Sequence, residues 1–257
     1  MRSLILIFFL YGCAPVAIIG EQENPIIERP TLQLLVDLPA PERKAVVSVY
    51  KFPDLTGQRK SSDNMALFSS AVTQGADLYL IEALMQAGGG TWFTVIERSG
   101  LANLTRERQL IVNTRESYDG EGSNKLQPLL YSGLIFEGGI VSYDTNYETG
   151  GIGARMLGIG INNRYKRDRV TVSLRAILVQ TGEILLNVST SKTIFSTGAG
   201  TDVFKFYESG TQLIETESGL SKNETVGYAT KTAIEAAVYA LILQGIKLDM
   251  WDYKVGE

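Results

Sequence analysis

Hydrophobic and polar residues alternate along the chain with a period that changes several times, and each change predicts a new element. Residues 45–52 are apolar, rich in β-branched side chains and followed by Pro53, which predicts a strand. Over residues 68–85 apolar side chains recur at spacings of three and four, and three glycines follow shortly after, which predicts a helix. The polar residues 56–67 lie between these elements and are expected to form a loop.

The rest of the chain also alternates between segments with helical spacing and segments with strand patterns. Residues 101–111 and the alanine-rich residues 226–246 have helical spacing, and the charges of the first are expected to face solvent. Four further segments have strand patterns, at residues 92–97, 134–143, 170–179 and 184–193. The last two flank the turn sequence QTGE, which predicts a β-hairpin. The sequence therefore predicts an α+β fold with an α/β-like alternation of strands and helices.

A glycine-rich segment, residues 147–167, does not fit this alternation. As a strand, a turn near Gly158 and a second strand, it separates oily from polar positions, because strand side chains point alternately to opposite faces. The oily positions are Gly150, Ile152, Ala154, Met156, Ile159, Ile161 and Tyr165. The polar or bare positions are Thr149, Gly151, Gly153, Arg155, Asn162, Arg164 and Lys166. Each arm has about ten residues, the length of a transmembrane β-strand.

Residues 196–222 have a weaker pattern of the same kind. One arm has Thr197, Ala199, Thr201 and Val203 on one face, and a turn region precedes the second arm. Glu215 and Glu217 share a face of that second arm, where paired carboxylates fit either general acid–base chemistry or a water-filled lumen. We favour the lumen, in which the carboxylates are simply solvated.

Two other structures could use the glycines of residues 147–167. A dinucleotide-binding loop would need a third glycine at Met156, and no G-K-[ST] sequence follows for a phosphate-binding loop. An exposed hairpin on a soluble domain also has an oily and a polar face, and this alternative stays open. A hairpin in lipid leaves edge amides unpaired at roughly several kcal/mol each, so it would require a closed ring of subunits.

The amino-acid composition excludes several classes of functional site. The 257 residues include no histidine and one cysteine, which excludes the usual zinc sites, Ser-His-Asp triads, Cys-His dyads and intrachain disulfides. Lys and Arg number 24 against 28 Asp and Glu, and the net charge of -4 provides no basic surface for a nucleic acid. The length suits one large domain or two small ones.

The amino terminus has the pattern of a lipoprotein leader. Arg2 precedes an apolar run, and Gly12 stands directly before Cys13, although Tyr11 is bulkier than the usual residue of this motif. Residues 1–12 are therefore predicted to be a signal peptide, and Cys13 is the predicted lipid attachment site.

The leader is followed by an arm and then by the main domain. Residues 13–44, rich in Pro, Glu and Gln, predict an extended, lipid-anchored arm before a periplasmic domain at residues 45–257. Ala14 rather than Asp follows the cysteine, which favours transport to the outer membrane in Gram-negative bacteria. No later window has about 18 uninterrupted apolar residues, so a membrane crossing would use strands.

Several short motifs are spread over nearly the whole chain. They are LPAP at residues 38–41, VSVY at 47–50, TGQ at 56–58, FSSAV at 68–72, a run from WF to ER at 92–108, GGIGAR at 150–155, TGEIL at 181–185, TSKTI at 190–194 and LDMWD at 248–252. With these motifs the chain resembles the CsgG family, the outer-membrane secretion channel lipoproteins of the curli system. Single motifs among them would not be specific, whereas the set is.

The resemblance implies an oligomeric channel. In the family, nine lipid-anchored subunits form a ring in the outer membrane, each with a periplasmic α/β domain and two β-hairpins that build one continuous β-barrel. Such channels export unfolded curli-type amyloid subunits by diffusion, with a periplasmic adaptor and a surface nucleation accessory as partners. The resemblance thus implies no catalytic residue, no metal and no cofactor.

The resemblance also gives the predicted loop a role as a pore constriction, which in the family is lined by a tyrosine, an asparagine and a phenylalanine. Phe68 matches the phenylalanine, Leu67 occupies the asparagine place, and the tyrosine place falls on Ser62 or Asp63. Asn64 could supply the amide if the loop has another shape. A simple packing role for Phe68 at the start of a helix stays open.

Alternatives to a channel make different predictions for the same residues. In the channel, the lumen would be lined by Arg155, Asn162, Arg164, Glu215 and Glu217. A periplasmic lipoprotein that only binds or regulates another envelope protein would instead have exposed loops at both glycine-rich segments. An envelope hydrolase would use Glu215 and Glu217 as its acid and base.

Overall fold

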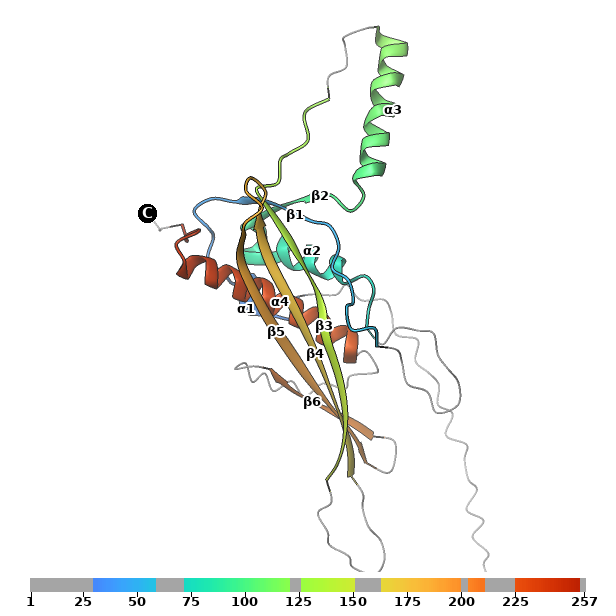
Figure 1. Cartoon of the computed structure of the whole chain (residues 1–257), viewed down its shortest axis with the longest axis vertical. Helices are drawn as coiled ribbons and strands as arrows, with labels where there is room; N and C mark the ends of the chain where they lie inside the picture. Colours follow the sequence, from blue (N-terminus) through green and yellow to red (C-terminus); the bar gives the residue numbers. More distant parts are fainter. Residues whose placement is uncertain are drawn as a thin grey trace, which may run out of the picture.

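Six strands form one mixed sheet in a computed structural model that describes residues 30–58, 72–120, 126–150, 163–199, 203–210 and 225–254. The strands are β1 (Ala45–Val49), β2 (Phe93–Glu97), β3 (Leu134–Gly150), β4 (Asn163–Leu178), β5 (Ile184–Ala199) and β6 (Val203–Gly210). Their order in the sheet is β2-β1-β3-β4-β5-β6, and Figure 1 shows β3, β4 and β5 as the longest of them.

The sheet has a parallel half and an antiparallel half. β1 pairs in parallel with β2 and with β3, which is possible because long connections that include helices lie between these strands. β3, β4, β5 and β6 pair antiparallel in sequence order. The β4–β5 turn contains Gly182 at a φ of 73°, a left-handed conformation that glycine adopts without strain.

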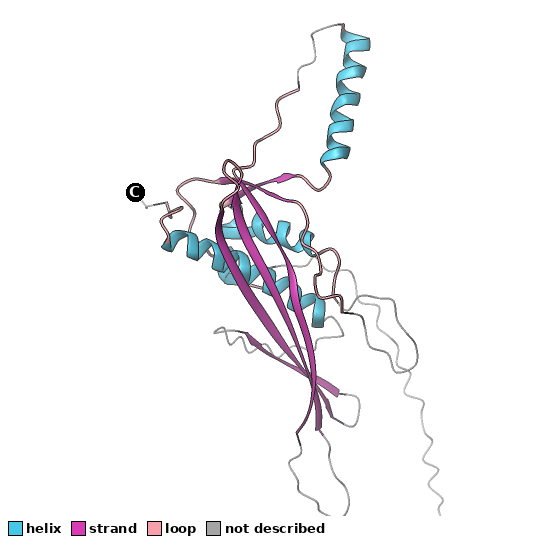
Figure 2. Cartoon of the chain, in the orientation of Figure 1, coloured by secondary structure: helices cyan, strands magenta, loops and turns pink. Residues whose placement is uncertain are grey.

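Helices cover one face of the sheet. The helices of the described residues are α1 (Gln33–Val36), α2 (Ala76–Gln86), the 3-10 helix η1 (Ala87–Gly90), α3 (Leu101–Asp119) and α4 (Thr225–Lys247), and all except α3 belong to this layer. α4 contacts β4, β5, α1 and α2, and Figure 2 shows these helices grouped on one side of the strands. α3 stands apart from this layer, and none of its residues is buried.

α4 packs closely on the sheet because its inner positions are small. Ala229, Ala233 and Ala237 are at most 1% exposed and alternate along the helix with larger buried residues such as Ile234 and Leu241. Aromatic side chains close the end of this core, where Trp92 lies edge-on to Trp251 at 6.4 Å between ring centroids and to Tyr253 at 5.9 Å.

The N-terminal arm joins this core through one carboxylate. Glu235 of α4 is 2% exposed, and its Oε2 accepts hydrogen bonds from the Thr31 backbone N–H at 2.9 Å, the Thr31 hydroxyl at 2.8 Å and the Leu32 backbone N–H at 2.7 Å. Burial raises the pKa of the Glu235 carboxyl above its ordinary value of 4.5, and the bonds from Thr31 and Leu32 oppose that rise. Leu32, Leu35 and Leu38 are buried, so the second part of the predicted arm belongs to the domain.

The predicted elements differ from the observed ones mainly in length. β3, β4 and β5 extend well beyond the predicted strands, and α3 continues to Asp119 where the pattern indicated an end near Ile111. α1 was not predicted, because four residues are too few to show a helical period. α2 begins at Ala76 within the described residues, whereas the pattern placed the helix start near Phe68, which lies outside them.

One helix of the described residues is long and apolar enough to cross a membrane, residues Val226–Lys247 of α4. The sequence pattern predicts this helix at residues 226–246 but not as a membrane span, because Lys231 and Glu235 interrupt its apolar run. Since 61% of this helix segment is buried against the sheet and the other helices, α4 is a core helix.

Candidate functional site

The antiparallel half of the sheet extends past the helices as a long ribbon of strands (Figure 1). β3 and β4 pair without interruption from Ser142 opposite Thr171 to Gly150 opposite Asn163. β5 follows β4 along nearly the same length, up to Gly198 opposite Arg164. This ribbon contains the base of the predicted membrane hairpin, residues 147–150 and 163–167.

The register of the ribbon aligns the two arms of the first hairpin. Thr149 lies opposite Arg164, and both are positions that the sequence assigned to the polar face. Gly150, assigned to the oily face, lies opposite Asn163. Because opposite residues of an antiparallel pair occupy the same face, the described part of the hairpin keeps the polar positions of both arms together.

A β-bulge in β3 decides which positions face the helices. The register shifts between Ile140 and Ser142, and the extra residue, Val141, is 44% exposed. Before the bulge Phe136 and Ile140 are fully buried, whereas after it Tyr143 packs against the core. The helix-covered face therefore changes from even-numbered to odd-numbered positions at this point.

A buried carboxylate lies where the ribbon leaves the helices. Asp168 of β4 is 1% exposed, and its Oδ1 accepts hydrogen bonds from the Thr145 hydroxyl at 2.7 Å and the Tyr143 hydroxyl at 3.2 Å. All three residues lie on the helix-covered face, since Thr145 is opposite Asp168 and Tyr143 is opposite the buried Val170. These bonds link β3 to β4 at the start of the ribbon.

The second hairpin reverses earlier than its pattern indicated. β5 ends at Ala199, and β6 begins at Val203 and pairs with β5 as far as Gly210 opposite Lys192. The sequence analysis had assigned both Ala199 and Val203 to the first arm. The assignment of both residues to one arm is wrong, because Ala199 ends β5 and lies opposite Val203 at the start of β6.

Two strand edges of the ribbon have no partner among the described residues. One is the outer edge of β6, the last strand of the sheet, and the other is the outer edge of β3 after the short bridge between Asp54 and Ile140. Unpaired N–H and C=O groups on such edges can pair with a strand of another chain.

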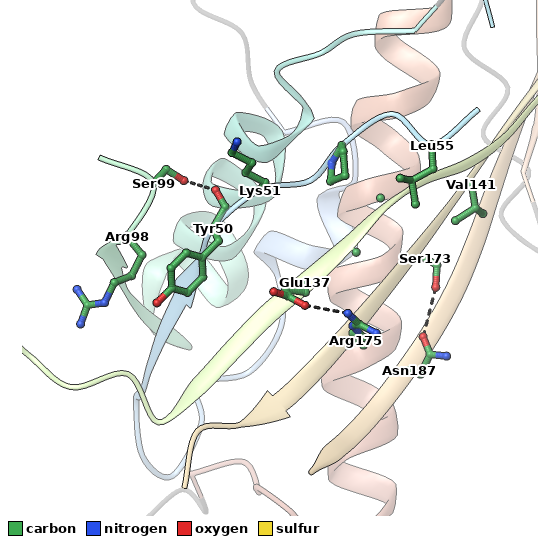
Figure 3. Close-up of a pocket in the computed structure, with 13 residues that line it drawn as sticks. Tyr50, Lys51, Leu55, Arg98, Ser99, Glu137, Val141, Ser173, Arg175 and Asn187 are labelled. Carbon is green, nitrogen blue, oxygen red and sulfur yellow. Dashed lines mark hydrogen bonds and ion pairs between the residues drawn. The ribbon is translucent and has the colours of Figure 1, made fainter. Parts of the chain in front are cut away.

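A groove of about 720 Å³ lies on the face of the sheet that the helices leave uncovered, as Figure 3 shows. Arg175 donates to Glu137 at 2.8 Å, and the Ser173 hydroxyl donates to Asn187 at 3.3 Å. Because the Arg175–Glu137 pair is well exposed to solvent, it contributes about 0–1 kcal/mol. These two interactions join polar side chains that line the groove. No three acidic, His or Cys residues gather into a metal site within the described ranges.

Most of the predicted site residues lie outside the described residues. These are Cys13, Ser62, Asp63, Asn64, Leu67, Phe68, Arg155, Asn162, Glu215 and Glu217. Arg164 is in β4, with its backbone placed between Thr149 of β3 and Gly198 of β5. The roles of all these residues therefore stay predictions.

Comparison with known proteins establishes the family. A family model described as "Curli production assembly/transport component CsgG" matches residues 27–257. The chain belongs to the CsgG family.

Curated CsgG proteins match along almost the whole chain. The protein of Escherichia coli (strain K12) is 39% identical over 253 residues, which cover 97% of this chain and 89% of that protein. The protein of Salmonella typhimurium (strain LT2) is 38% identical over 252 residues with the same coverage. The CsgG protein of Citrobacter koseri is 41% identical over 220 residues, which cover 85% of this chain and 78% of that protein.

Two solved structures are similar to this CsgG family member at lower sequence identity. A PelC dodecamer from Paraburkholderia phytofirmans is 14% identical with a TM-score of 0.31, covering 79% of this chain and 91% of that chain. The lipoprotein GNA1162 from Neisseria meningitidis is 12% identical with a TM-score of 0.31, covering 78% of this chain and 99% of that chain.

Sequence reasoning missed one polar residue beside the predicted constriction loop of this CsgG family member. Asp54 follows β1 and is half-buried, and its carboxylate accepts hydrogen bonds from Thr56 and Gln74. A single aspartate between a strand and a loop usually indicates only a turn. The sequence signal that could have identified it is the following Thr56, because Asp-x-Thr is a common pattern of local side chain to backbone bonding.

Proposed function

We propose that this chain is one subunit of an oligomeric outer-membrane channel that secretes curli-type proteins. Its family is named for curli production, assembly and transport. The observation that carries the proposal is the antiparallel ribbon of β3 to β6, which extends past the helices and has an unpartnered edge on each side among the described residues.

An open ribbon cannot lie in lipid as a monomer. Each unpaired backbone group in hydrocarbon costs roughly several kcal/mol, so both edges need a strand from another subunit. The two edges of one subunit are different, which makes the contact head-to-tail. Head-to-tail contacts form a ring when the rotation from one subunit to the next closes on itself. A ring in which β6 of one copy pairs with β3 of the next would remove every edge and form a shared barrel.

The proposed channel has a polar lumen and a narrow loop region. Arg155, Asn162, Arg164, Glu215 and Glu217 are the lumen positions of this proposal. Ser62, Asp63, Asn64, Leu67 and Phe68 are the constriction positions. A narrow ring of such side chains passes an extended chain and excludes a folded domain, which is far wider than a strand. Transport would be diffusive, with no nucleotide-binding loop or catalytic group required.

The proposal includes a membrane anchor and partners. Cys13 would carry the lipid that holds the subunit at the outer membrane, with the bulk of the domain in the periplasm. Assembly into a ring of nine copies, a periplasmic adaptor and a surface accessory protein complete the proposed system.

Size and conductance test the channel together. The full chain, extracted from outer membranes in detergent, should elute as a large oligomer and give discrete current steps in planar bilayers. A monomer that produces no conductance would refute the channel.

One structural observation favours a different function, a periplasmic lipoprotein that binds another envelope protein without a pore. Within the part of the chain that the structure describes, β6 has eight residues, whereas a transmembrane β-strand needs about 9–11. This candidate predicts a stable monomer that remains soluble once the lipid anchor is removed by Cys13→Ser. Aggregation of that variant without detergent would count against it.

A further inference from the structure

The base of the predicted constriction loop is attached to β3 at the bulge. After β1 the chain continues along the same edge of β3, and Asp54 forms a parallel bridge with Ile140. The Leu55 N–H donates to the Ile140 carbonyl at 2.9 Å, and the Ile140 N–H donates to the Pro53 carbonyl at 3.0 Å. The chain therefore enters residues 56–71 from a backbone position fixed on the sheet.

Glycine in β3 makes this attachment possible. A Cβ added at Gly139 would lie 2.7 Å from the Pro53 carbonyl oxygen and 3.1 Å from the Leu55 side chain. A distance of 2.7 Å to a backbone atom is too short for a real Cβ, so any other residue at Gly139 would push the 53–55 segment away. The close approach to the sheet depends on this one position.

The Asp54 carboxylate accepts hydrogen bonds from residues at the start of the predicted constriction loop and after it. Its Oδ1 accepts the Thr56 backbone N–H at 2.9 Å and the Thr56 hydroxyl at 2.7 Å. Its Oδ2 accepts the side-chain amide of Gln74 at 3.2 Å, across 20 positions of sequence. Thr56 is where the chain enters the loop, and Gln74 lies just before α2, where the chain has returned. One side chain thus holds the entry and the exit together.

We propose that Asp54 is the positioning residue of the constriction loop, because it fastens both loop ends to each other and to the sheet. The inference rests on the proposed function for the role of the loop as a constriction, while the fastening itself is a property of the fold. Holding loop ends together removes much of the conformational freedom of the intervening residues.

Proteolysis of the full chain in detergent tests the fastening without any use of the pore. Arg59 and Lys60 are trypsin sites inside the loop. Asp54→Ala should increase the rate of cleavage at these sites on the order of tenfold, since hydrogen bonds to a carboxylate are lost at both ends. Asp54→Asn keeps an acceptor oxygen for Thr56 and should restore most of the protection. Asp77→Ala, the same chemical change at the start of α2, is the matched control and should cleave like the wild type.

Conductance tests the consequence for the pore. Channels of Asp54→Ala should show a broader distribution of single-channel conductance than wild-type channels, and Asp54→Asn channels should return towards the wild-type distribution. Unchanged cleavage in Asp54→Ala would overturn the fastening, and normal cleavage in Gln74→Ala would overturn the claim that the exit is held. If cleavage increases while the conductance distribution does not change, Asp54 is not a positioning residue of the constriction.

The two hypotheses fail in different ways. A wild-type protein without conductance refutes the channel, whereas the trypsin comparison still decides whether Asp54 holds the loop ends. If Asp54→Ala does not fold, Gln74→Ala provides the test, because it removes only the exposed Gln74 side chain and leaves Asp54 bonded to Thr56. Its cleavage rate should lie between those of the wild type and a fully released loop.

Discussion

Glu235 makes the stability of the domain depend on pH. Burial raises the pKa of this carboxyl, so the unfolded chain loses the proton at a lower pH than the folded chain does. Between the ordinary value of 4.5 and the raised value, the folded state holds more protons, and the free energy of unfolding therefore falls as pH increases. Above the raised pKa both states have lost the proton, so the free energy of unfolding no longer changes with pH through Glu235.

Glu235→Gln should remove this part of the pH dependence. An amide oxygen can still accept the bonds from Thr31 and Leu32, but it does not titrate. Urea unfolding of both proteins, followed by the fluorescence of the buried Trp92, should show wild-type stability falling relative to the variant as pH rises from 4.5. A constant difference across this pH range would contradict the prediction.

Gly245 of α4 marks the tightest contact between the helix and the C-terminal segment. A Cβ at this position would lie 2.3 Å from the ring of Trp251, whose indole N–H donates to the Ile242 carbonyl at 2.9 Å. Gly245→Ala should therefore displace the ring and reduce the free energy of unfolding by about 1–3 kcal/mol.

Gly227 in the same helix provides the control. A Cβ there would meet nothing within 4 Å, so Gly227→Ala should leave stability unchanged or raise it by about 0.5–1 kcal/mol. Equal effects of the two substitutions in urea unfolding would show that helix propensity, rather than the contact with Trp251, determines the result.

At the level of elements, α3 differs from every other long helix. It has 19 residues and none of them is buried, although Leu101, Leu104 and Ile111 form a partly exposed stripe. Most of the stability of a helix in a folded protein comes from packing one of its faces against other elements. Backbone amides of α3 should therefore exchange with deuterium much faster than those of α4, as mass spectrometry of peptides from the two helices can measure. Equal protection in the detergent-extracted protein would mean that another chain covers α3.

The elements that sequence reasoning located best are those with strong apolar periods. Val170, Val172 and Leu174 alternate inward on β4 under α4, and the predicted strand contains all three. The same strand begins earlier, at Asn163, because backbone pairing with β3 and β5 continues where the side chains become polar. Side-chain pattern indicates where a strand is covered, and it does not indicate where pairing stops.

At the level of the whole molecule, the two sides of the ribbon should tolerate charge differently. Ile152 and Gly153 are neighbours that the sequence assigns to the oily and the polar face of the first hairpin. Arginine on a lipid-facing position costs about 2–4 kcal/mol at the middle of a bilayer, whereas lumen positions accept it. Ile152→Arg should abolish assembly of the channel, and Gly153→Arg should permit assembly with an altered conductance.

Bilayer recordings and sizing of both variants measure this difference. If both variants assemble equally well, the hairpin does not contact lipid. If both fail, the residues do not alternate between two environments, and the strand interpretation of this segment is wrong.

The candidate site was predicted from sequence only in part. The alternation within residues 147–167 gave two faces, and the observed register keeps Thr149 and Arg164 together. The fastening of the loop by Asp54 could not be predicted, because it joins residues 20 positions apart whose proximity depends on how β1, β3 and α2 assemble. Contacts between elements depend on how the elements pack, and the spacing of apolar residues within one element does not predict them.

The extra residue at Val141 has a consequence for the wall of the proposed barrel. Upstream of it the even positions of β3 lie under the helices, and downstream of it the odd positions do. Deletion of Val141 would exchange the two predicted faces of the first arm, so that Ile152 and Met156 would face water and Arg155 would face lipid. Substitution of Val141 by another residue would not change the orientation of the arm. The number of residues in β3 near the bulge therefore determines which face of the proposed barrel lines the lumen, although the bulge itself lies far from any contact with the membrane.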